Sequence, residues 1–349
     1  MQVRDFVGQT GEWLKGTGPE SDVVVSSRVR LARNVAGFPF VNRCSPADRE
    51  AIESYLATSI RSLPRPLIYF RLDRLSELER LLLLERHLIS RDHHETDGVR
   101  GVALDSTEST SIMINEEDHI RMQVLRSGFE MESLASVAQA LDDELSERVE
   151  YAYSEKFGFL TACPTNVGTG MRVSVMTHLP ALELTNQLER VFQLVRRIHF
   201  HIRGFYGEGS HATGSFYQIS NQITLGKSEQ ETVKSINALV PQIVDTERKA
   251  RETLVKKGGP LLEDRIYRAL GLLKTARRID TGEALTLLSH VRLGINTGMI
   301  RGLTVPDLNG ILLSVQPGHL QALRGSEIDD PVQRDIARAE FIRNKLSET

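Results

Sequence analysis

Three consecutive acidic residues, Glu116, Glu117 and Asp118, stand close behind the short apolar run from Ile112 to Ile114. The run is typical of a buried strand, and Arg121 follows the acids three residues later. Neighbouring carboxylates repel one another. Three of them at the end of a buried strand, with an arginine just behind, raise the question of what requires so much negative charge at one point.

Arginine recurs on alternate positions of three predicted strands, which cover residues 22–34, 171–177 and 198–203. Side chains of a strand point alternately to its two faces, so each strand places arginine opposite its apolar residues. The polar faces carry Arg28 and Arg30; Arg172 and Ser174; and His199, His201 and Arg203. A solvated outer face is the simpler explanation for any one strand. Three strands together, with Arg121 beside the acids, favour arginines that converge on one site.

Converging arginines predict a polyanionic ligand, and a nucleoside triphosphate is the obvious one. Guanidinium groups stay charged, and their planar fork matches phosphate oxygens two at a time. The familiar phosphate-binding loops are missing from the sequence. GSHATGS at 209–215 has the glycines of a P-loop without its lysine, and GTGMRVS at 168–174 lacks the third glycine of a dinucleotide fingerprint. We therefore expect side chains, rather than loop amides, to hold the nucleotide.

Four blocks of the sequence, SSRVRLARN, NEEDHIR, CPTNVGTGMRVSV and RGFYGEG, resemble in type and order the signature blocks of the ATP:guanido phosphotransferases, the phosphagen kinase family. The resemblance covers about residues 22–245. It implies ATP and Mg²⁺ as cofactors, with the Mg²⁺ carried by the nucleotide and no direct protein ligand. It also implies that Glu117 and Glu208 grip the guanidinium of the second substrate, with Cys163 next to it. The residues implied to bind ATP are Ser27, Arg28, Val29, Arg30, Leu31, His87, Arg121, Arg172, Val173, Ser174, Val175, Met176, Arg203, Gly204, Phe205, Tyr206 and Gly207.

Such a reaction explains the acidic cluster, because a guanidinium nitrogen would be the nucleophile and arginine, with a pKa above about 12, does not release its proton easily. A fixed carboxylate can orient this nitrogen toward the γ-phosphorus and take the proton as the bond forms, an effect typically of about 10²–10⁴ in rate. Two alternatives stay open. Glu116 or Asp118 could hold Mg²⁺ through water or cap a turn, and Cys163 could be a packed thiol.

The sequence departs from the small-molecule kinases of this family in three places. Only 25 residues precede Ser26, where those enzymes carry a helical domain that encloses the free guanidino substrate. Tyr206 stands where they carry another arginine, and a helical region follows the catalytic part. This arrangement resembles the McsB-type bacterial protein arginine kinases over the whole chain, which implies an acceptor arginine presented on a protein surface.

The run RDIARA near the C-terminus resembles the RDxxRA motif of the McsB-type kinases. The resemblance implies an allosteric pocket that binds phosphoarginine, with Arg334 and Arg338 on the phosphate and Asp335 near the guanidino end, and Ala339 completing the motif. Arg334 and Arg338 are one helical turn apart and share a face. Without the resemblance, this stretch would be interpreted as a solvated helix with internal ion pairs.

The same resemblance implies partners and a setting. These are protein substrates with exposed arginines, the heat-shock repressor CtsR, the activator protein McsA and the Clp unfoldase and protease, within a bacterial stress response. Two other functions remain as alternatives. One is a kinase of a free guanidino metabolite such as arginine, and the other is a non-catalytic adaptor that reads phosphoarginine.

The elements that must position these residues form an α+β chain, with short separate strands that predict an antiparallel sheet. Helices are predicted at about 46–63, 75–90, 132–149 and 182–197, and RDHHETDG after the second is predicted as a solvated loop. From Ser228 helical patterns dominate, punctuated by Gly258-Gly259-Pro260, with a boundary near 245–260. We predict a lead-in at 1–21, a catalytic domain with helices packed on its sheet at 22–250 and a smaller all-helical domain at 251–349. The apolar stripe at 284–295 would suit either a homodimer interface or core packing.

Composition sets the outer bounds. The 349 residues include 43 basic and 46 acidic side chains, a net charge of −3 that gives no sign of a nucleic-acid or membrane partner. The N-terminus lacks the pattern of a signal peptide, and no run approaches the roughly 18 apolar residues of a membrane span. Cys44 and Cys163 are too few and too far apart for a disulfide framework or a metal motif. We expect a reduced, cytoplasmic protein.

Overall fold

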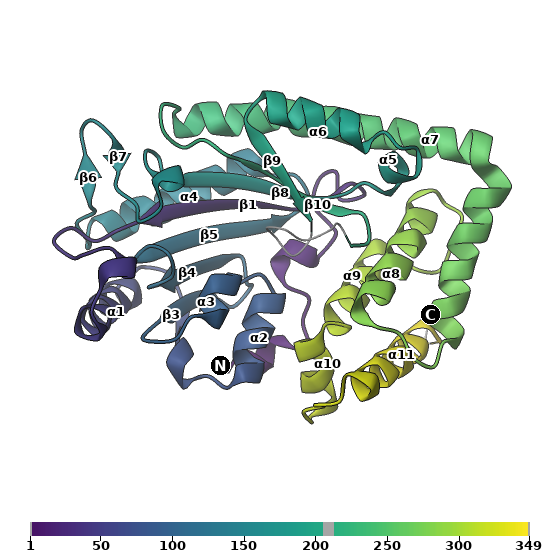
Figure 1. The fold of residues 1–349 in the computed structure, drawn as a ribbon, viewed down its shortest axis with the longest axis horizontal. Coiled ribbons are helices and arrows are strands. Elements are labelled where there is room, and N and C mark those ends of the chain that lie inside the picture. The colour runs from purple at the N-terminus through teal and green to yellow at the C-terminus, as the bar shows by residue number, and fades with distance from the viewer. Residues whose placement is uncertain (1, 205–212, 348–349) are drawn as a thin grey trace.

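An eight-stranded antiparallel sheet forms the centre of the computed structural model, which describes residues 2–204 and 213–347 (Figure 1). Its strands are β1 (Val24–Arg33), β2 (Leu67–Arg71), β3 (Gly101–Asp105), β4 (Thr110–Ile114), β5 (Ile120–Ser127), β8 (Met171–His178), β9 (Phe200–Gly204) and β10 (Phe216–Asn221). They lie in the order β2-β3-β4-β5-β1-β8-β10-β9, and β6 (Tyr153–Ser154) and β7 (Gly158–Phe159) form a separate hairpin. The predicted antiparallel sheet is confirmed.

Eleven α-helices and five short 3₁₀ helices complete the described residues. The α-helices are α1 (Pro46–Arg61), α2 (Glu77–Glu85), α3 (Arg91–Glu95), α4 (Met131–Ser146), α5 (Pro180–Leu184), α6 (Leu188–Arg197), α7 (Glu229–Thr275), α8 (Thr281–Asn296), α9 (Val305–Ser314), α10 (Pro317–Arg324) and α11 (Pro331–Ser347). The 3₁₀ helices are η1 (Val3–Phe6), η2 (Glu12–Leu14), η3 (Val41–Arg43), η4 (Leu72–Arg74) and η5 (Pro164–Asn166). Among the described residues, no helix combines the length and apolar character needed to cross a membrane.

The apolar face of the sheet is closed by α4 and the first part of α7. Val29 and Leu31 of β1 are fully buried there, in one cluster with Leu141 of α4 and Val240 of α7. Because alternate residues of a strand point to opposite faces, burial of these positions places the intervening arginines on the other side. The packing therefore fixes which face of the sheet carries the charged residues.

A second core joins the C-terminal helices to the end of the sheet where β1 begins. It contains residues of α7, α8, α9 and α11 together with Val25, Leu125 and Met176 of the sheet. Trp13 and Leu14 of η2 also belong to it, so the predicted lead-in is a buried part of the fold. In Figure 1 the purple N-terminal segment passes between the sheet and α9.

Helix α7 continues through the glycines and proline that predict a break. It spans 47 residues with Pro241 and Pro260 inside it, so the expected interruption at Gly258-Gly259-Pro260 is wrong. The helix changes direction along its length (Figure 1), and a proline produces such a change because it cannot donate the intrahelical hydrogen bond. Packing of α7 on both cores outweighs the local helix-breaking residues.

Two further local predictions are corrected. The stretch after α2 is the short helix α3 rather than a solvated loop, and His93 within it is buried with its Nε2 3.1 Å from the Gly101 carbonyl. The helix predicted at 182–197 is two helices, α5 and α6, because Asn186 between them takes a left-handed conformation. Helix α1 begins as predicted, with the Ser45 side chain accepting a hydrogen bond from the Asp48 amide.

Candidate active site

The three acids lie in the tight connection between β4 and β5, and each has a different environment. Glu116 is buried, pairs with Arg121 and accepts a hydrogen bond from the Ser90 hydroxyl at 2.5 Å. Asp118 is buried and accepts hydrogen bonds from the Asn34 amide at 2.6 Å and the Ala162 backbone amide at 2.7 Å. Glu117 is exposed.

Glu117 is steadied by the segment that precedes β8. The side-chain amide of Asn166 donates to Glu117 Oε2 at 3.0 Å. Sequence analysis missed Asn166, although it stands within the block CPTNVGTG. One oxygen of Glu117 is thus oriented by η5, while the exposed carboxylate remains accessible from solvent.

The predicted arginines share one face of the sheet. Directly opposite residues of an antiparallel pair lie on the same face, and Arg30 lies opposite Arg172 in the pairing of β1 with β8. The pairing of β1 with β5 places Arg121 opposite Ala32, two residues from Arg30 along β1. Arg28 lies opposite Ser174 and donates from Nε to its hydroxyl at 3.3 Å. Arg203 of β9 reaches the same face through its register with Gln218 of β10.

Crowding of these cations makes their charges costly. Burial, and then repulsion from Arg121, lowers the pKa of Arg28 to about 10. Burial also lowers the pKa of Arg30 well below its usual range, with further repulsion from Arg28 and Arg121. The pKa of Arg172 is lowered by burial and by Arg121 and Arg203. A polyanion placed among these groups would relieve the repulsion.

Arg121 is neutralised by a carboxylate partner, Glu116. Burial alone would lower the pKa of Arg121, but the pairing with Glu116 outweighs it and raises the pKa. The same pairing, with the Ser90 hydroxyl, overcomes burial and holds the pKa of Glu116 at about 2. The Nε atoms of Arg30 and Arg172 are buried without a hydrogen-bond partner among the residues described. This face of the sheet therefore carries positive charge and unpaired N–H donors, a combination suited to binding an anion.

Cys163 is connected to the arginine face through Thr165. Its Sγ lies 3.1 Å from the Thr165 hydroxyl, which accepts a hydrogen bond from Arg172 Nη2 at 3.2 Å. Cys163 is half-buried and free of any disulfide. Thr165 and Asn166, one after the other in η5, thus connect the thiol, an arginine and Glu117. The link comes from a loop that sequence periodicity does not reveal.

A small pocket lies at the end of the arginine face nearest the start of β1. It is lined by Trp13, Ser26, Arg28, His87, Leu125, Ser174, Met176 and Gln218. His87, predicted to lie beside the adenine, is one of its walls. Burial, with repulsion from Arg28, lowers the pKa of His87 to about 3, so the ring is neutral at physiological pH. Trp13 is a wall that sequence analysis did not single out.

Several other predicted nucleotide-binding residues turn their side chains away from this face. Val29, Leu31, Val173 and Val175 lie in the apolar core, and the Ser27 hydroxyl donates to the Gly128 carbonyl. These residues hold the strand backbones in register and do not line the pocket. Gly204 ends β9, and Phe205, Tyr206, Gly207 and Glu208 lie outside the described residues.

The predicted phosphoarginine pocket falls on α11. Arg338 is buried and donates to the Val315 carbonyl at 2.8 Å, the Ile279 carbonyl at 3.0 Å and Asp335 at 2.8 Å. Arg334, one turn earlier and half-buried, donates to the Ile328 carbonyl at 2.9 Å, and Ala339 is buried. Arg338 thus connects α11 to the segments before α8 and after α9, and the assignment of a ligand to this motif stays a prediction.

The described residues include no group of three or more His, Cys, Asp or Glu side chains that could hold a metal ion. The carboxylates nearest the arginines are already bound to protein groups: Glu116 to Arg121, Asp118 to Asn34, and Glu117 to Asn166. This arrangement is compatible with a magnesium ion that is held by nucleotide phosphates.

Two family models match this chain. The ATP:guanido phosphotransferase C-terminal catalytic domain matches residues 50–250, and the protein-arginine kinase McsB C-terminal domain matches residues 260–349. The first model covers most of the sheet and the acidic turn. The second covers the last part of α7 and the helices that follow.

Curated relatives match over nearly the full length. A protein-arginine kinase of Halothermothrix orenii is 43% identical over 99% of this chain and 100% of its own. That of Bacillus subtilis is 43% identical over 99% of this chain and 96% of its own. The chain therefore belongs to the ATP:guanido phosphotransferase family and, within it, to the protein-arginine kinases.

Solved structures agree with the fold. A lombricine kinase shares 26% identity at a TM-score of 0.60, over 70% of each chain. The substrate-free duplicated taurocyamine kinase of Schistosoma mansoni shares 26% identity at a TM-score of 0.59, over 76% of this chain and 39% of its own. The guanidino-kinase fold predicted from the sequence blocks is confirmed.

Proposed function

We propose that this enzyme transfers the γ-phosphate of ATP to guanidino groups of arginine residues in proteins. The observation that carries the proposal is the single sheet face on which Arg28, Arg30, Arg121 and Arg172 gather, with the exposed Glu117 at its border. A triphosphate fits the arginines, and a guanidinium fits the carboxylate. The acceptor class follows the protein-arginine kinases that match the whole chain.

Glu117 acts on the acceptor. Its carboxylate orients one guanidinium nitrogen toward the γ-phosphorus and takes the proton as the nitrogen–phosphorus bond forms. The bond between the γ-phosphorus and its bridging oxygen breaks, and ADP leaves with the electron pair. Glu116 and Asp118 are unsuited to this task because both are buried and bound to protein groups. Glu208 would grip the other side of the guanidinium.

The arginines act on the donor. They hold the phosphates in line with the acceptor and neutralise charge on the transferring group, which is the main requirement of phosphoryl transfer. Mg²⁺ would be held by the nucleotide phosphates and would supply further charge neutralisation there. Cys163, joined to Arg172 through Thr165, positions groups near the acceptor and forms no covalent intermediate.

The partners follow from the same proposal. Protein substrates would include a heat-shock repressor of the CtsR type, which phosphorylation would inactivate, and damaged proteins marked for the Clp unfoldase and protease in the cytoplasm. McsA would act as activator. Phosphoarginine bound at Arg334, Asp335, Arg338 and Ala339 would regulate the enzyme.

The test incubates the enzyme with MgATP and an arginine-rich unfolded protein, followed by mass spectrometry under non-acidic conditions. We expect phosphoarginine on the protein and loss of the label in mild acid, as for a phosphoramidate. Turnover of free arginine with an unmodified protein would instead establish the kinase of a free guanidino metabolite. Binding of phosphoarginine without any transfer would establish the adaptor.

A further inference from the structure

Trp13, the only tryptophan of the chain, forms one wall of the pocket at the end of the arginine face. Its side chain is 2% exposed. The indole meets the His87 ring edge to face, with centroids 4.6 Å apart and planes at 88°. His87 holds this place with a left-handed backbone conformation, φ 57°, which non-glycine residues adopt rarely. The two rings therefore make a defined corner at the nucleotide end of the sheet.

The indole N–H of Trp13 is a buried donor with no acceptor among the described residues. Buried tryptophan N–H groups usually find a hydrogen-bond partner, and a missing one is unfavourable. The other pocket residues within reach of a shared ligand include Arg28 and Gln218, both polar. One wall of this pocket thus contains a buried donor that lacks an acceptor, beside an arginine that we expect to bind phosphate.

The C-terminal helices hold both aromatic walls in place. Asn309 of α9 donates to the Leu14 carbonyl at 2.6 Å, next to Trp13, and its own oxygen accepts from Arg292 at 2.6 Å. His319 of α10 bonds Glu85 Oε2 through Nδ1 at 2.6 Å. These contacts fix the backbone on both sides of the pocket.

The position of the pocket matches the far end of a nucleotide. Arg28 lines it, and Arg30 stands two residues further along β1, about 6.6 Å away at the usual rise of a strand. Arg172 lies opposite Arg30, toward Glu117. Phosphates on the arginines thus leave the base at Trp13 and His87.

We propose that Trp13 binds the adenine of ATP, with its indole N–H donating to a ring nitrogen of the base. This inference rests on the proposed function in placing ATP on the arginine face. It assigns to the N-terminal segment a direct role in nucleotide binding, which residues 1–21 do not show in the pattern of their sequence.

Tryptophan fluorescence tests the proposal in the unmodified enzyme, because emission comes from Trp13 alone. We titrate ADP in one experiment and inorganic tripolyphosphate in another, and follow binding of each by calorimetry. ADP should change the emission in proportion to the bound fraction, whereas tripolyphosphate should bind with little change. Equal changes with both ligands, or bound ADP without any change, would overturn the assignment.

The variant Trp13→Phe keeps an aromatic ring and removes the donor. We expect its Kd for ADP to rise about tenfold, the effect of a lost buried hydrogen bond, while its Kd for tripolyphosphate stays the same. Leu14→Met, in the same short helix and outside the pocket lining, is the matched control and should leave both constants unchanged. An unchanged Kd for ADP in a folded Trp13→Phe protein would refute the hydrogen bond.

These readouts separate the two proposals. Phosphoarginine formation without a specific fluorescence response to ADP would refute the role of Trp13 and support the proposed kinase activity. A specific response to ADP in an enzyme that never phosphorylates protein arginine would support the role of Trp13 and refute the kinase activity. The fluorescence experiment decides the question even if the variant fails to fold.

Discussion

Three adjacent carboxylates acquire three roles because each meets a different neighbour. Glu116 faces the guanidinium of Arg121 inside the protein and stays ionised. Asp118 braces the turn through Asn34 and the Ala162 amide. Glu117 between them points outward and keeps its carboxylate exposed beside Asn166. Glu116 and Asp118 therefore stabilise the structure, whereas Glu117 is available to act on the substrate.

Replacing Glu117 by Gln should separate chemistry from nucleotide binding. The amide keeps the size of the side chain but cannot take a proton, so we expect the rate of phosphoryl transfer to fall by about 10²–10⁴. The Kd for ADP should change less than about twofold, since the arginines are untouched. Glu155→Gln, an exposed acid in the connection between β6 and β7, serves as the control and should retain full activity. Full turnover in the Glu117 variant would remove this residue from the mechanism.

Glu116 should make stability depend on pH at the acidic end. Its pKa in the folded protein is about 2, below the ordinary value of 4.5. The pair with Arg121 therefore contributes fully above pH 4.5, and the contribution is lost as the pH falls toward 2. Replacing Glu116 by Gln should lower the free energy of unfolding by about 3 kcal/mol at pH 7, and by clearly less at pH 3.

Chemical denaturation of both proteins at the two pH values measures this difference. Glu117→Gln is the matched control, because Glu117 is exposed and its removal strands no buried arginine. A gap between wild type and the Glu116 variant that is equally wide at pH 3 and pH 7 would contradict the assigned pairing.

At the scale of helices and strands, the alternation of polar and apolar residues is enough to predict that the arginines of the site share one face of the sheet. Alternation in SSRVRLAR and MRVSVM places Arg28, Arg30 and Arg172 on one face, and the strand register confirms that they meet. The alternation of apolar and polar residues depends only on neighbouring positions of the chain, so it predicts correctly which face of a strand each side chain occupies. What it cannot supply is contact between distant segments, and Asn166 reaches Glu117 across 49 positions.

Other errors have the same origin. Gly258-Gly259-Pro260 indicates a break by local propensity, yet α7 runs through it because both of its ends pack on cores. The sequence around His93 predicts a solvated loop, but in the fold the His93 ring donates a hydrogen bond to the carbonyl of Gly101, which begins β3. Trp13 lies in a stretch without the periodicity of a strand or helix, and it is buried by distant segments of the chain, namely β1, β5 and α9.

Helix α10 should influence nucleotide binding without touching the nucleotide. His319 bonds Glu85 at the end of α2, two residues before His87 in the pocket. Replacing His319 by Ala removes this anchor, so we expect the Kd for ADP, measured by calorimetry, to rise about fivefold. Leu323→Ala, an exposed site on the same helix, should leave the constant unchanged. A His319 variant that is folded and binds ADP as tightly as wild type would show that His87 needs no support from α10.

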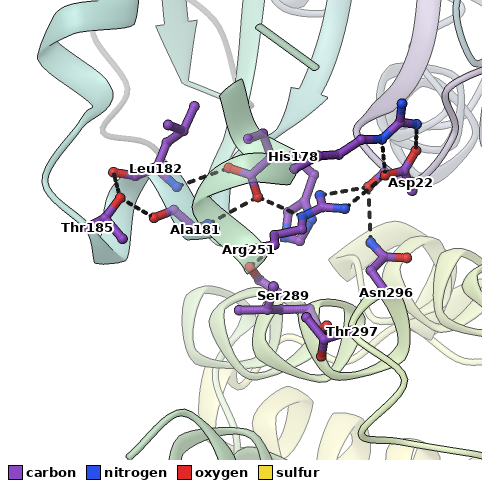
Figure 2. A network of polar contacts seen from close by, with 12 residues as sticks. Asp22, His178, Ala181, Leu182, Thr185, Arg251, Ser289, Asn296 and Thr297 are labelled. Atoms are coloured by element: carbon purple, nitrogen blue, oxygen red, sulfur yellow. Dashed lines mark hydrogen bonds and ion pairs between the residues drawn. The ribbon is translucent and has the colours of Figure 1, made fainter. Parts of the chain in front are cut away.

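At the scale of the whole molecule, a buried polar network joins the catalytic sheet to the C-terminal helices (Figure 2). Arg251 of α7 donates to Asp22 at 2.9 Å and to Glu247 at 2.8 Å, and Asn296 of α8 donates to the Asp22 carbonyl at 3.0 Å. Glu247 in turn accepts from the Ala181 and Leu182 amides at the start of α5.

A second contact crosses the same boundary. His178, at the end of β8, lies with Nε2 2.8 Å from the Ser289 hydroxyl of α8. Burial, with repulsion from Arg292 and Arg251, lowers its pKa well below the usual range, so this ring is neutral. With α7 shared by both cores and these contacts between them, the catalytic sheet and the helical region should unfold in one cooperative transition.

Two arginines of α7 allow a matched test of this network. Replacing Arg251 by Ala strands the buried carboxylate of Glu247 and leaves Asp22 with fewer donors, so the free energy of unfolding should fall by about 3–5 kcal/mol. Arg268 is exposed and pairs along the helix with Asp264 at 3.0 Å, so Arg268→Ala should lower the free energy of unfolding by less than about 1 kcal/mol. Chemical denaturation measures both values, and activity at low temperature confirms that the variants are folded. If Arg251→Ala and Arg268→Ala lower the free energy of unfolding equally, the ion pairs of Arg251 do not hold the catalytic sheet and the helical region together. Apolar packing would then be responsible for that contact.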